Sequence, residues 1–244
     1  MKVVIPAAGL GKRFVAGGIH SPKELLPLGG QPLIGHALSE ALHAGFEGAV
    51  VVVSPAKKGL RDYLDGGNHP LPVEVVLQPE PRGIGDVILR CWKGESLGVL
   101  LPDDVVIKGD HWNQLIGLNK LSGAATLCVR PVPKETVGRF GIVEREGNKV
   151  LRLFEKPSPG TTASNLAIFG RYLVTQSVIA GLTACHPAGE LELTFGFASA
   201  LNSPDGVRTV DFAADIYDCG TPVEYAASKI RFQETFRADA SPNS

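Results

Sequence analysis

The sequence is poor in cysteine, and none of its apolar runs approaches the ~20 residues that a membrane-spanning helix requires. Its cysteines, Cys91, Cys128, Cys185 and Cys219, are widely scattered and form no Cys-x-x-Cys pair. This spacing argues against a disulfide framework and against a cysteine-based metal site. Near the N-terminus, glycines interrupt the apolar run too early for a secretory signal peptide. We therefore expect reduced thiols in a cytoplasmic protein with no membrane partner.

An excess of charge of either sign is also absent, since 24 basic and 25 acidic residues leave a net charge of −1. Such a balance provides no basic surface for nucleic acid or for an anionic membrane, so we expect neither as a partner. The hydrophobic fraction of 44% and the mean hydropathy of +0.10 are typical of a globular protein. A chain of 244 residues is long enough for one sizeable α/β domain with a full core.

The order of the apolar segments predicts the fold class. Short β-branched runs, typical of strands buried on both faces, stand at residues 3–6, 48–53, 73–77, 98–101 and 124–129. Segments with the apolar spacing of helices alternate with them at residues 33–44, 57–64, 86–92 and 112–121. This alternation predicts right-handed βαβ units. The fold expected is α/β, with a Rossmann-like, open, mixed and mainly parallel sheet flanked by helices.

Beyond residue 130 the expected strands lie closer together. They are predicted at residues 141–144, 150–154, 165–171, 207–211 and 216–219, with helices at 174–182, 195–201 and 222–236. We see no repeat and no linker that would divide the chain. We therefore predict a single domain over residues 1–237, followed by a disordered polar tail over residues 238–244.

The first expected strand runs directly into a glycine turn with cations beside it. Gly9 and Gly11 let the backbone approach an anion closely, while Arg13 and Lys23 supply positive charge. A NAD-binding fingerprint is disfavoured because Phe14 stands where it requires Gly or Ala, and no Gly-Lys-Ser/Thr completes a P-loop. The turn suits a nucleoside triphosphate that is attacked at its inner phosphate. An ordinary strand-to-helix turn with solvated cations is the alternative.

Carboxylates follow two of the expected strands, at the ends where open α/β sheets bind their ligands. Asp103 and Asp104 come after strand 98–101, and Asp218 ends the late strand that begins at residue 216. Two carboxylates that converge near a phosphate loop are suitable ligands for Mg²⁺, with phosphate oxygens completing its shell. Alternatively, each aspartate serves only as the N-cap of the helix that follows it.

Nine sequence blocks, in order along the chain, carry a family resemblance. They are IPAAGLGKRF (5–14), PKELLPL (22–28), QPEPRGIG (78–85), LLPDD (100–104), GRFGIVE (138–144), EKP (155–157), SNLAIFGRY (164–172), GELELT (189–194) and YDCG (217–220). Through these blocks the chain resembles the sugar-1-phosphate nucleotidyltransferases, and most closely the bacterial glucose-1-phosphate uridylyltransferases. The resemblance implies the nucleotide-diphospho-sugar transferase type of fold.

The resemblance also implies a reaction and its residues. A sugar 1-phosphate oxygen attacks the α-phosphorus of a nucleoside triphosphate and expels pyrophosphate in the presence of Mg²⁺. The substrates that the resemblance favours are UTP and glucose 1-phosphate. The residues that match catalytic cations are Arg13 and Lys23, and those that match the Mg²⁺ ligands are Asp103 and Asp218. The positions that match nucleotide-binding residues are Ala8, Gly9, Gly11, Gln78, Gly83 and Asp104. Those that match sugar-phosphate-binding residues are Gly141, Glu155, Lys156, Asn165 and Glu190. A homo-oligomer is implied as well.

The chain departs from this family pattern at three places. Asp86 stands where the uridylyltransferases usually carry His, Phe195 replaces an acidic residue, and the segment 63–73 is short. A thymidylyl-, cytidylyl- or guanylyltransferase is therefore an open alternative, since nucleotide and sugar depend on such positions. A non-catalytic nucleotide-sugar-binding protein is a second alternative, which the retained catalytic cations and metal carboxylates disfavour. A dinucleotide-dependent oxidoreductase is a third.

Overall fold

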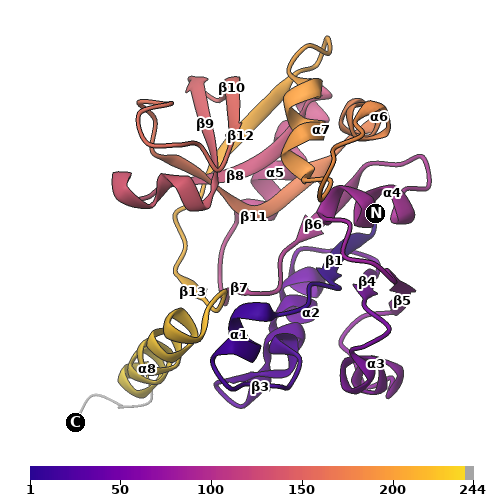
Figure 1. Ribbon diagram of the computed structural model, residues 1–244, viewed down its shortest axis with the longest axis vertical. Helices are drawn as coiled ribbons and strands as arrows, with labels where there is room; N and C mark the ends of the chain where they lie inside the picture. The colour runs from indigo at the N-terminus through magenta and orange to yellow at the C-terminus, as the bar shows by residue number, and fades with distance from the viewer. Residues whose placement is uncertain (240–244) are drawn as a thin grey trace.

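The computed structural model describes residues 1–239 and is built around one large sheet (Figure 1). Its strands are β1 (Val3–Ala7), β4 (Ala49–Val53), β5 (Val73–Leu77), β6 (Leu97–Leu100), β8 (Ala125–Pro131), β9 (Gly141–Glu146), β10 (Lys149–Glu155), β11 (Leu166–Val174) and β12 (Val207–Asp211). They lie in the order β5-β4-β1-β6-β11-β8-β12-β10-β9. The predicted open, mixed α/β sheet is confirmed.

Parallel pairing is concentrated in the first half of the chain. β1 pairs in parallel with β4 and β6, β4 with β5, and β8 with β12. The antiparallel pairs of this sheet all involve β10 or β11. The second half therefore adds a largely antiparallel extension to a parallel nucleotide-binding type of sheet.

Most of the helices cover the two faces of the sheet. The helices are α1 (Lys12–Ala16), α2 (Leu33–His43), α3 (Lys58–Asp65), α4 (Ile84–Cys91), α5 (His111–Ser122), α6 (Gln176–Ala184), α7 (Leu193–Ala200) and α8 (Pro222–Asp239). Along β1 and β4, alternate residues belong to different cores, because successive side chains of a strand point to opposite faces. Val4 packs in the core that contains residues of α4, α6 and α7, whereas Val3 and Ile5 pack in the core that contains residues of α2, α3 and α5.

Short elements complete the fold, and all of them except the late strand predicted at residues 216–219 are absent from the predicted set. They are the pair β2 (Pro27–Leu28) and β3 (Gln31–Pro32), the pair β7 (Asp104–Val106) and β13 (Ile216–Asp218), and the 3₁₀ turns Lys23–Leu25 and Lys134–Arg139. A separate apolar cluster, which includes Phe14, Val105, Tyr217 and Phe232, joins α1 and α8 to the β7–β13 ribbon. Figure 1 shows α8 beside this ribbon, away from the large sheet.

The C-terminal helix extends farther than predicted. α8 continues to Asp239, so the first two residues of the expected tail 238–244 are helical, and residues 240–244 lie outside the described part of the chain. Between residues 1 and 239, no helix has the length and apolar character needed to cross a membrane. All four cysteines are free, and three of them are buried, in agreement with the expected reduced thiols.

Candidate active site

The glycine turn begins where β1 ends and leads into α1. Gly11 has a φ of 60°, a left-handed conformation that suits glycine, and it caps the first turn of α1 without a side-chain hydrogen bond. A Cβ added at Gly9 or Gly11 would meet no atom within 4 Å, so the backbone here faces open space. The turn therefore leaves room for a ligand to approach its backbone closely.

That first cavity has a volume of about 370 Å³ and is lined by the turn. Its wall includes the predicted nucleotide-binding residues Ala8, Gly9, Gly11, Gln78 and Gly83, as well as the predicted catalytic cations. These residues come from three separate segments of the chain and line one space.

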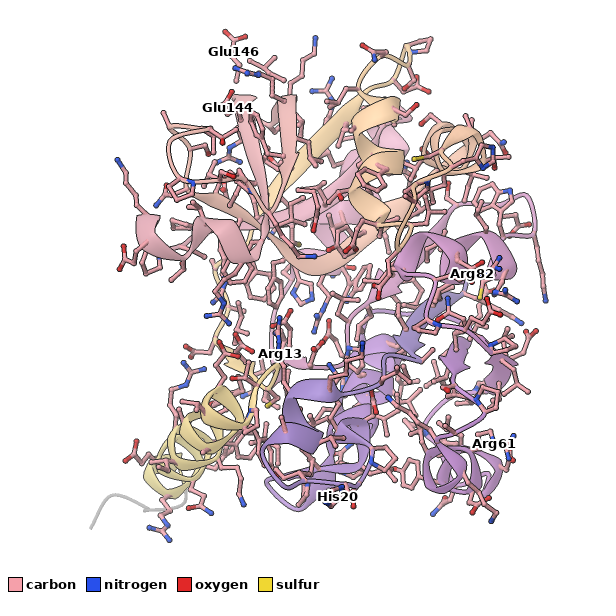
Figure 2. All side chains as sticks on the ribbon, viewed as in Figure 1. Arg13, His20, Arg61, Arg82, Glu144 and Glu146 are labelled. Carbon is pink, nitrogen blue, oxygen red and sulfur yellow. The ribbon has the colours of Figure 1, made fainter. Side chains whose placement is uncertain are left out.

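A second cavity, of about 430 Å³, adjoins the first. Gly141, Glu155 and Lys156, predicted to contact the sugar phosphate, line it. Arg13 and Asp103 line both cavities, so the two spaces meet at these residues. Figure 2 shows Arg13 between the part of the molecule that carries β1 and α1 and the part that carries β9 and β10.

The carboxylates meet because β7 and β13 pair. In this antiparallel ribbon Asp218 lies opposite Asp104, and the backbone N–H of Cys219 donates to the carbonyl of Asp103 at 2.7 Å. A Cβ placed on Gly220 would lie 3.2 Å from Asp218 Oδ1 and 3.8 Å from Asp103 Oδ2. These distances place the two carboxylate oxygens within about 7 Å of each other, both close to a point next to Gly220.

Burial and charge give these three carboxylates different proton affinities. Burial, together with the charges of Asp103 and Asp218, raises the pKa of Asp104 to about 7. Burial also raises the pKa of Asp218. For Asp103 burial acts in the same direction, but the Lys23 ammonium, whose Nζ lies 2.5 Å from Oδ2, outweighs it and lowers the pKa. Such a concentration of negative charge favours a cation.

The donor set fits Mg²⁺ when a nucleotide shares it. No group of three or more His, Cys, Asp or Glu side chains in residues 1–239 is arranged to hold a metal ion by itself. Mg²⁺ is commonly held by one or two carboxylates together with substrate phosphates and water, and Asp103 and Asp218 provide that partial set. Lys23, paired with Asp103, adds a positive charge on the side of the first cavity.

Lys156 is the centre of a polar cluster in the second cavity. Its Nζ lies 2.9 Å from Glu155 and 3.0 Å from Glu192, and Thr194 donates to Glu155 at 2.8 Å. Lys156 is the one non-glycine residue with positive φ among residues 1–239, at 43°. That conformation costs about 1–3 kcal/mol and tends to occur at functional sites. Gly141 faces the same cluster, because a Cβ there would lie 3.5 Å from Glu155.

A buried ion pair supports the glycine turn from behind. Lys57 Nζ lies 2.8 Å from both oxygens of Glu24 and donates to the carbonyl of Ala7 at 2.8 Å. Glu24 is 1% exposed. Burial lowers the pKa of Lys57, although the charge of Glu24 opposes this effect. Since Glu24 is next to Lys23, this pair joins the lysine segment to the end of β1.

A second buried network holds the carboxylate segment. Arg171, fully buried in β11, binds Glu40 of α2 through both carboxylate oxygens at 2.6 and 2.5 Å. The same guanidinium donates to the carbonyl of Asp104 at 2.6 Å and to that of Leu101 at 3.3 Å. Burial alone would raise the pKa of Glu40, but the charge of Arg171 and the hydrogen bonds from His111 and Arg171 bring it to about 2.

Three residues predicted from the sequence do not line the cavity that was expected for them. Asn165 lines neither cavity, because its Nδ2 donates to the carbonyl of Val132 at 2.7 Å. Glu190 lines the first cavity, not the second, and Asp104 lines the second, not the first. Glu192, which contacts Lys156, stands in the position expected of Glu190.

Several residues of the site were not predicted from the sequence. They are Arg130, Glu192 and Thr194, which line the second cavity, and the two supporting ion pairs, Glu24 with Lys57 and Glu40 with Arg171. Glu192 and Thr194 belong to the GELELT block, whose second acidic residue was a signal for the site. The supporting pairs join residues far apart in the sequence, and no local pattern marks them.

Comparison with known proteins identifies relatives over almost the whole chain. The family profile described as nucleotidyl transferase matches residues 2–230. A UTP–glucose-1-phosphate uridylyltransferase of Staphylococcus haemolyticus is 33% identical, with 95% of this chain and 91% of the relative covered. Among solved structures, a UDP-glucose pyrophosphorylase complexed with UDP-glucose has 27% identity and a TM-score of 0.84, over 96% of this chain and 98% of the other. A UTP-bound UDP-glucose pyrophosphorylase of Acinetobacter baumannii has 26% identity and a TM-score of 0.80, over 99% of both chains.

Proposed function

Because the chain belongs to the nucleotidyl transferase family, we propose that it joins UTP to glucose 1-phosphate, forming UDP-glucose and pyrophosphate. The observation that carries the proposal is the pair of adjoining cavities, which meet at Arg13 and Asp103. One cavity contains the glycine turn, suited to a triphosphate, and the other contains the Lys156 cluster, suited to a sugar phosphate. The names of the relatives supply the identity of the two substrates.

In the proposed reaction, a phosphate oxygen of glucose 1-phosphate forms a bond to the α-phosphorus of UTP. The bond between that phosphorus and its bridging oxygen breaks, and pyrophosphate leaves. Such a displacement needs positioning and charge neutralisation more than covalent help. Arg13, exposed and lining both cavities, is placed to stabilise the negative charge that develops on the leaving group. Lys23, in the first cavity, and Lys156, in the second, neutralise negative charge on the two substrates.

Mg²⁺ is part of the proposal, with Asp103 and Asp218 as the protein ligands. When bound, it supplies neutralisation of the phosphate oxygens. The raised pKa of Asp218 supports this assignment. Burial raises that pKa, and no cationic partner of Asp218 is strong enough to offset the effect of burial. Lys23 keeps Asp103 ionised and ready to act as a ligand.

We also propose self-association and a cytoplasmic location. Self-association is supported by α8, where Val223 is 79% and Ile230 is 60% exposed, since exposed aliphatic side chains on one helix favour a contact with another copy. A cytoplasmic location is supported by the free cysteines, which persist in reducing compartments.

The test is pyrophosphate release, with identification of the nucleotide sugar formed from UTP and glucose 1-phosphate. Activity that requires both substrates and Mg²⁺ is expected. The rival proposal, a nucleotide-sugar-binding protein without turnover, predicts binding of UDP-glucose but no pyrophosphate. Formation of a product only from another triphosphate or another sugar phosphate would overturn the substrate assignment. The proposed nucleotidyl transfer, with release of pyrophosphate, would still hold.

A further inference from the structure

Gln78, the residue that follows β5, is held by two hydrogen-bond acceptors. Its Nε2 donates to Asp86 Oδ2 at 2.8 Å and to the carbonyl of Gly83 at 3.2 Å. The side chain is 3% exposed and lines the first cavity beside the glycine turn. Among residues 1–239, no donor contacts its Oε1. The amide therefore has one edge fixed by the protein and one edge open to a ligand.

The chemistry of the two acceptors decides which edge is fixed. Arg90 Nε donates to the same Asp86 oxygen at 2.6 Å. Burial would raise the pKa of Asp86, but the hydrogen bonds from Arg90 and Gln78 and the nearby cations lower it, so the carboxylate is ionised near neutral pH. An ionised carboxylate and a carbonyl can only accept hydrogen bonds. Only the NH₂ group of Gln78 can face them, and Oε1 is left on the other edge of the planar amide.

We propose that Asp86 is a positioning residue that fixes the Gln78 amide with Oε1 toward the base, so that the site selects bases with a ring N–H on their pairing edge. Uracil and thymine carry this N–H at N3, and guanine carries it at N1. Cytosine N3 and adenine N1 are acceptors, and an acceptor that faces Oε1 leaves two buried lone pairs without a donor. The inference rests on the proposed function, because it assigns the base of the nucleotide in that same cavity. It makes CTP a poor substrate through an acidic residue that does not line the cavity.

The test compares UTP with CTP in the wild type and in three variants. In Asp86→Ala the amide loses its main anchor and can turn, so the UTP/CTP ratio of kcat/KM should fall about tenfold or more. Asp86→Asn keeps an oxygen acceptor and should retain most of the ratio. Arg90→Ala, the matched control, removes the ion pair but leaves Asp86 to accept from Gln78, so the ratio should change by less than about threefold.

Equilibrium binding of UTP and CTP, measured by calorimetry in the same proteins, provides a readout that does not depend on turnover. The inference is overturned if Asp86→Ala keeps the wild-type UTP/CTP ratio in binding and in kcat/KM, or if the wild type accepts CTP as well as UTP. It is also overturned if the UTP/CTP ratio falls as much in Asp86→Asn as in Asp86→Ala. The charge of Asp86, rather than its acceptance of a hydrogen bond, would then be the cause of the selectivity. Absence of turnover with every triphosphate, accompanied by selective UTP binding that Asp86→Ala weakens, would contradict the proposed function and support this inference.

Discussion

Replacement of Glu40 by Gln is predicted to destabilise the protein strongly, although Glu40 does not line either substrate cavity. The substitution removes the counter-charge of Arg171, which is fully buried. The interactions with Arg171 and His111 lower the pKa of Glu40 from 4.5 to about 2. A tenfold change in proton affinity is equivalent to about 1.4 kcal/mol, so this carboxylate contributes about 3 kcal/mol of stability. Breaking a buried pair by removing one partner typically costs about 3–5 kcal/mol, which agrees with this value.

The stabilisation that Glu40 provides should decrease as the pH falls. Because the folded-state pKa of Glu40 lies below its unfolded-state value, its contribution is fully present above pH 4.5 and is lost as the pH falls toward about 2. Urea denaturation of the wild type and of Glu40→Gln should therefore show a difference of about 3 kcal/mol or more at pH 7. The difference should narrow below pH 4.5.

An exposed ion pair provides the control for this experiment. Lys58 and Asp62 lie 2.8 Å apart with side chains 78% and 57% exposed, so Asp62→Asn should change the free energy of unfolding by less than about 1 kcal/mol. The reasoning is refuted if Glu40→Gln differs from the wild type by less than about 1 kcal/mol at pH 7, or if the difference does not change below pH 4.5.

Three other substitutions test the site itself. Arg13→Ala should lower kcat about 10²-fold with little change in stability, because the charge acts on the developing pyrophosphate; a rise in KM alone would assign Arg13 to ground-state binding. Asp218→Asn should raise the Mg²⁺ concentration for half-maximal pyrophosphate release about tenfold or more, and an unchanged Mg²⁺ dependence would remove Asp218 from the ligand set. Glu24→Gln should lower the free energy of unfolding, measured in urea, by about 3 kcal/mol, because it leaves Lys57 buried without a counter-charge. The double variant Glu24→Leu, Lys57→Met should recover much of that loss, and a double variant no more stable than Glu24→Gln would contradict this cause.

Strand ends were the part of the site that the sequence predicted well. A buried β-branched run followed by Asp103 identifies both the strand and the edge at which its carboxylate lies. The convergence of Asp103 with Asp218 was also anticipated, but its cause was not. The two meet through the β7–β13 ribbon, whose strands are three residues long and more than 100 residues apart in the sequence. The strand at residues 216–219 was predicted, but β7 was not, so the pairing of the two could not be anticipated.

Loop side chains were predicted less well because distant backbone contacts orient them. The Glu190 segment is fixed by backbone bonds of Leu191, which donates to the carbonyl of Arg82 at 2.8 Å and accepts from Gly85 at 2.7 Å. These bonds turn Glu190 toward the first cavity and leave Glu192 for the Lys156 cluster. The amide of Asn165, predicted to contact the sugar phosphate, donates through Nδ2 to the Val132 carbonyl.

The central claim, that a sugar phosphate attacks the inner phosphorus of UTP, is tested most directly by following a radioactive phosphorus atom. UTP labelled at the α-phosphorus is incubated with glucose 1-phosphate, Mg²⁺ and the protein, and the products are separated by chromatography. The account predicts that the label is found in UDP-glucose and that the pyrophosphate released is unlabelled. Label in UMP or UDP without a nucleotide sugar, or no release of pyrophosphate from a folded protein that binds UTP, would contradict it.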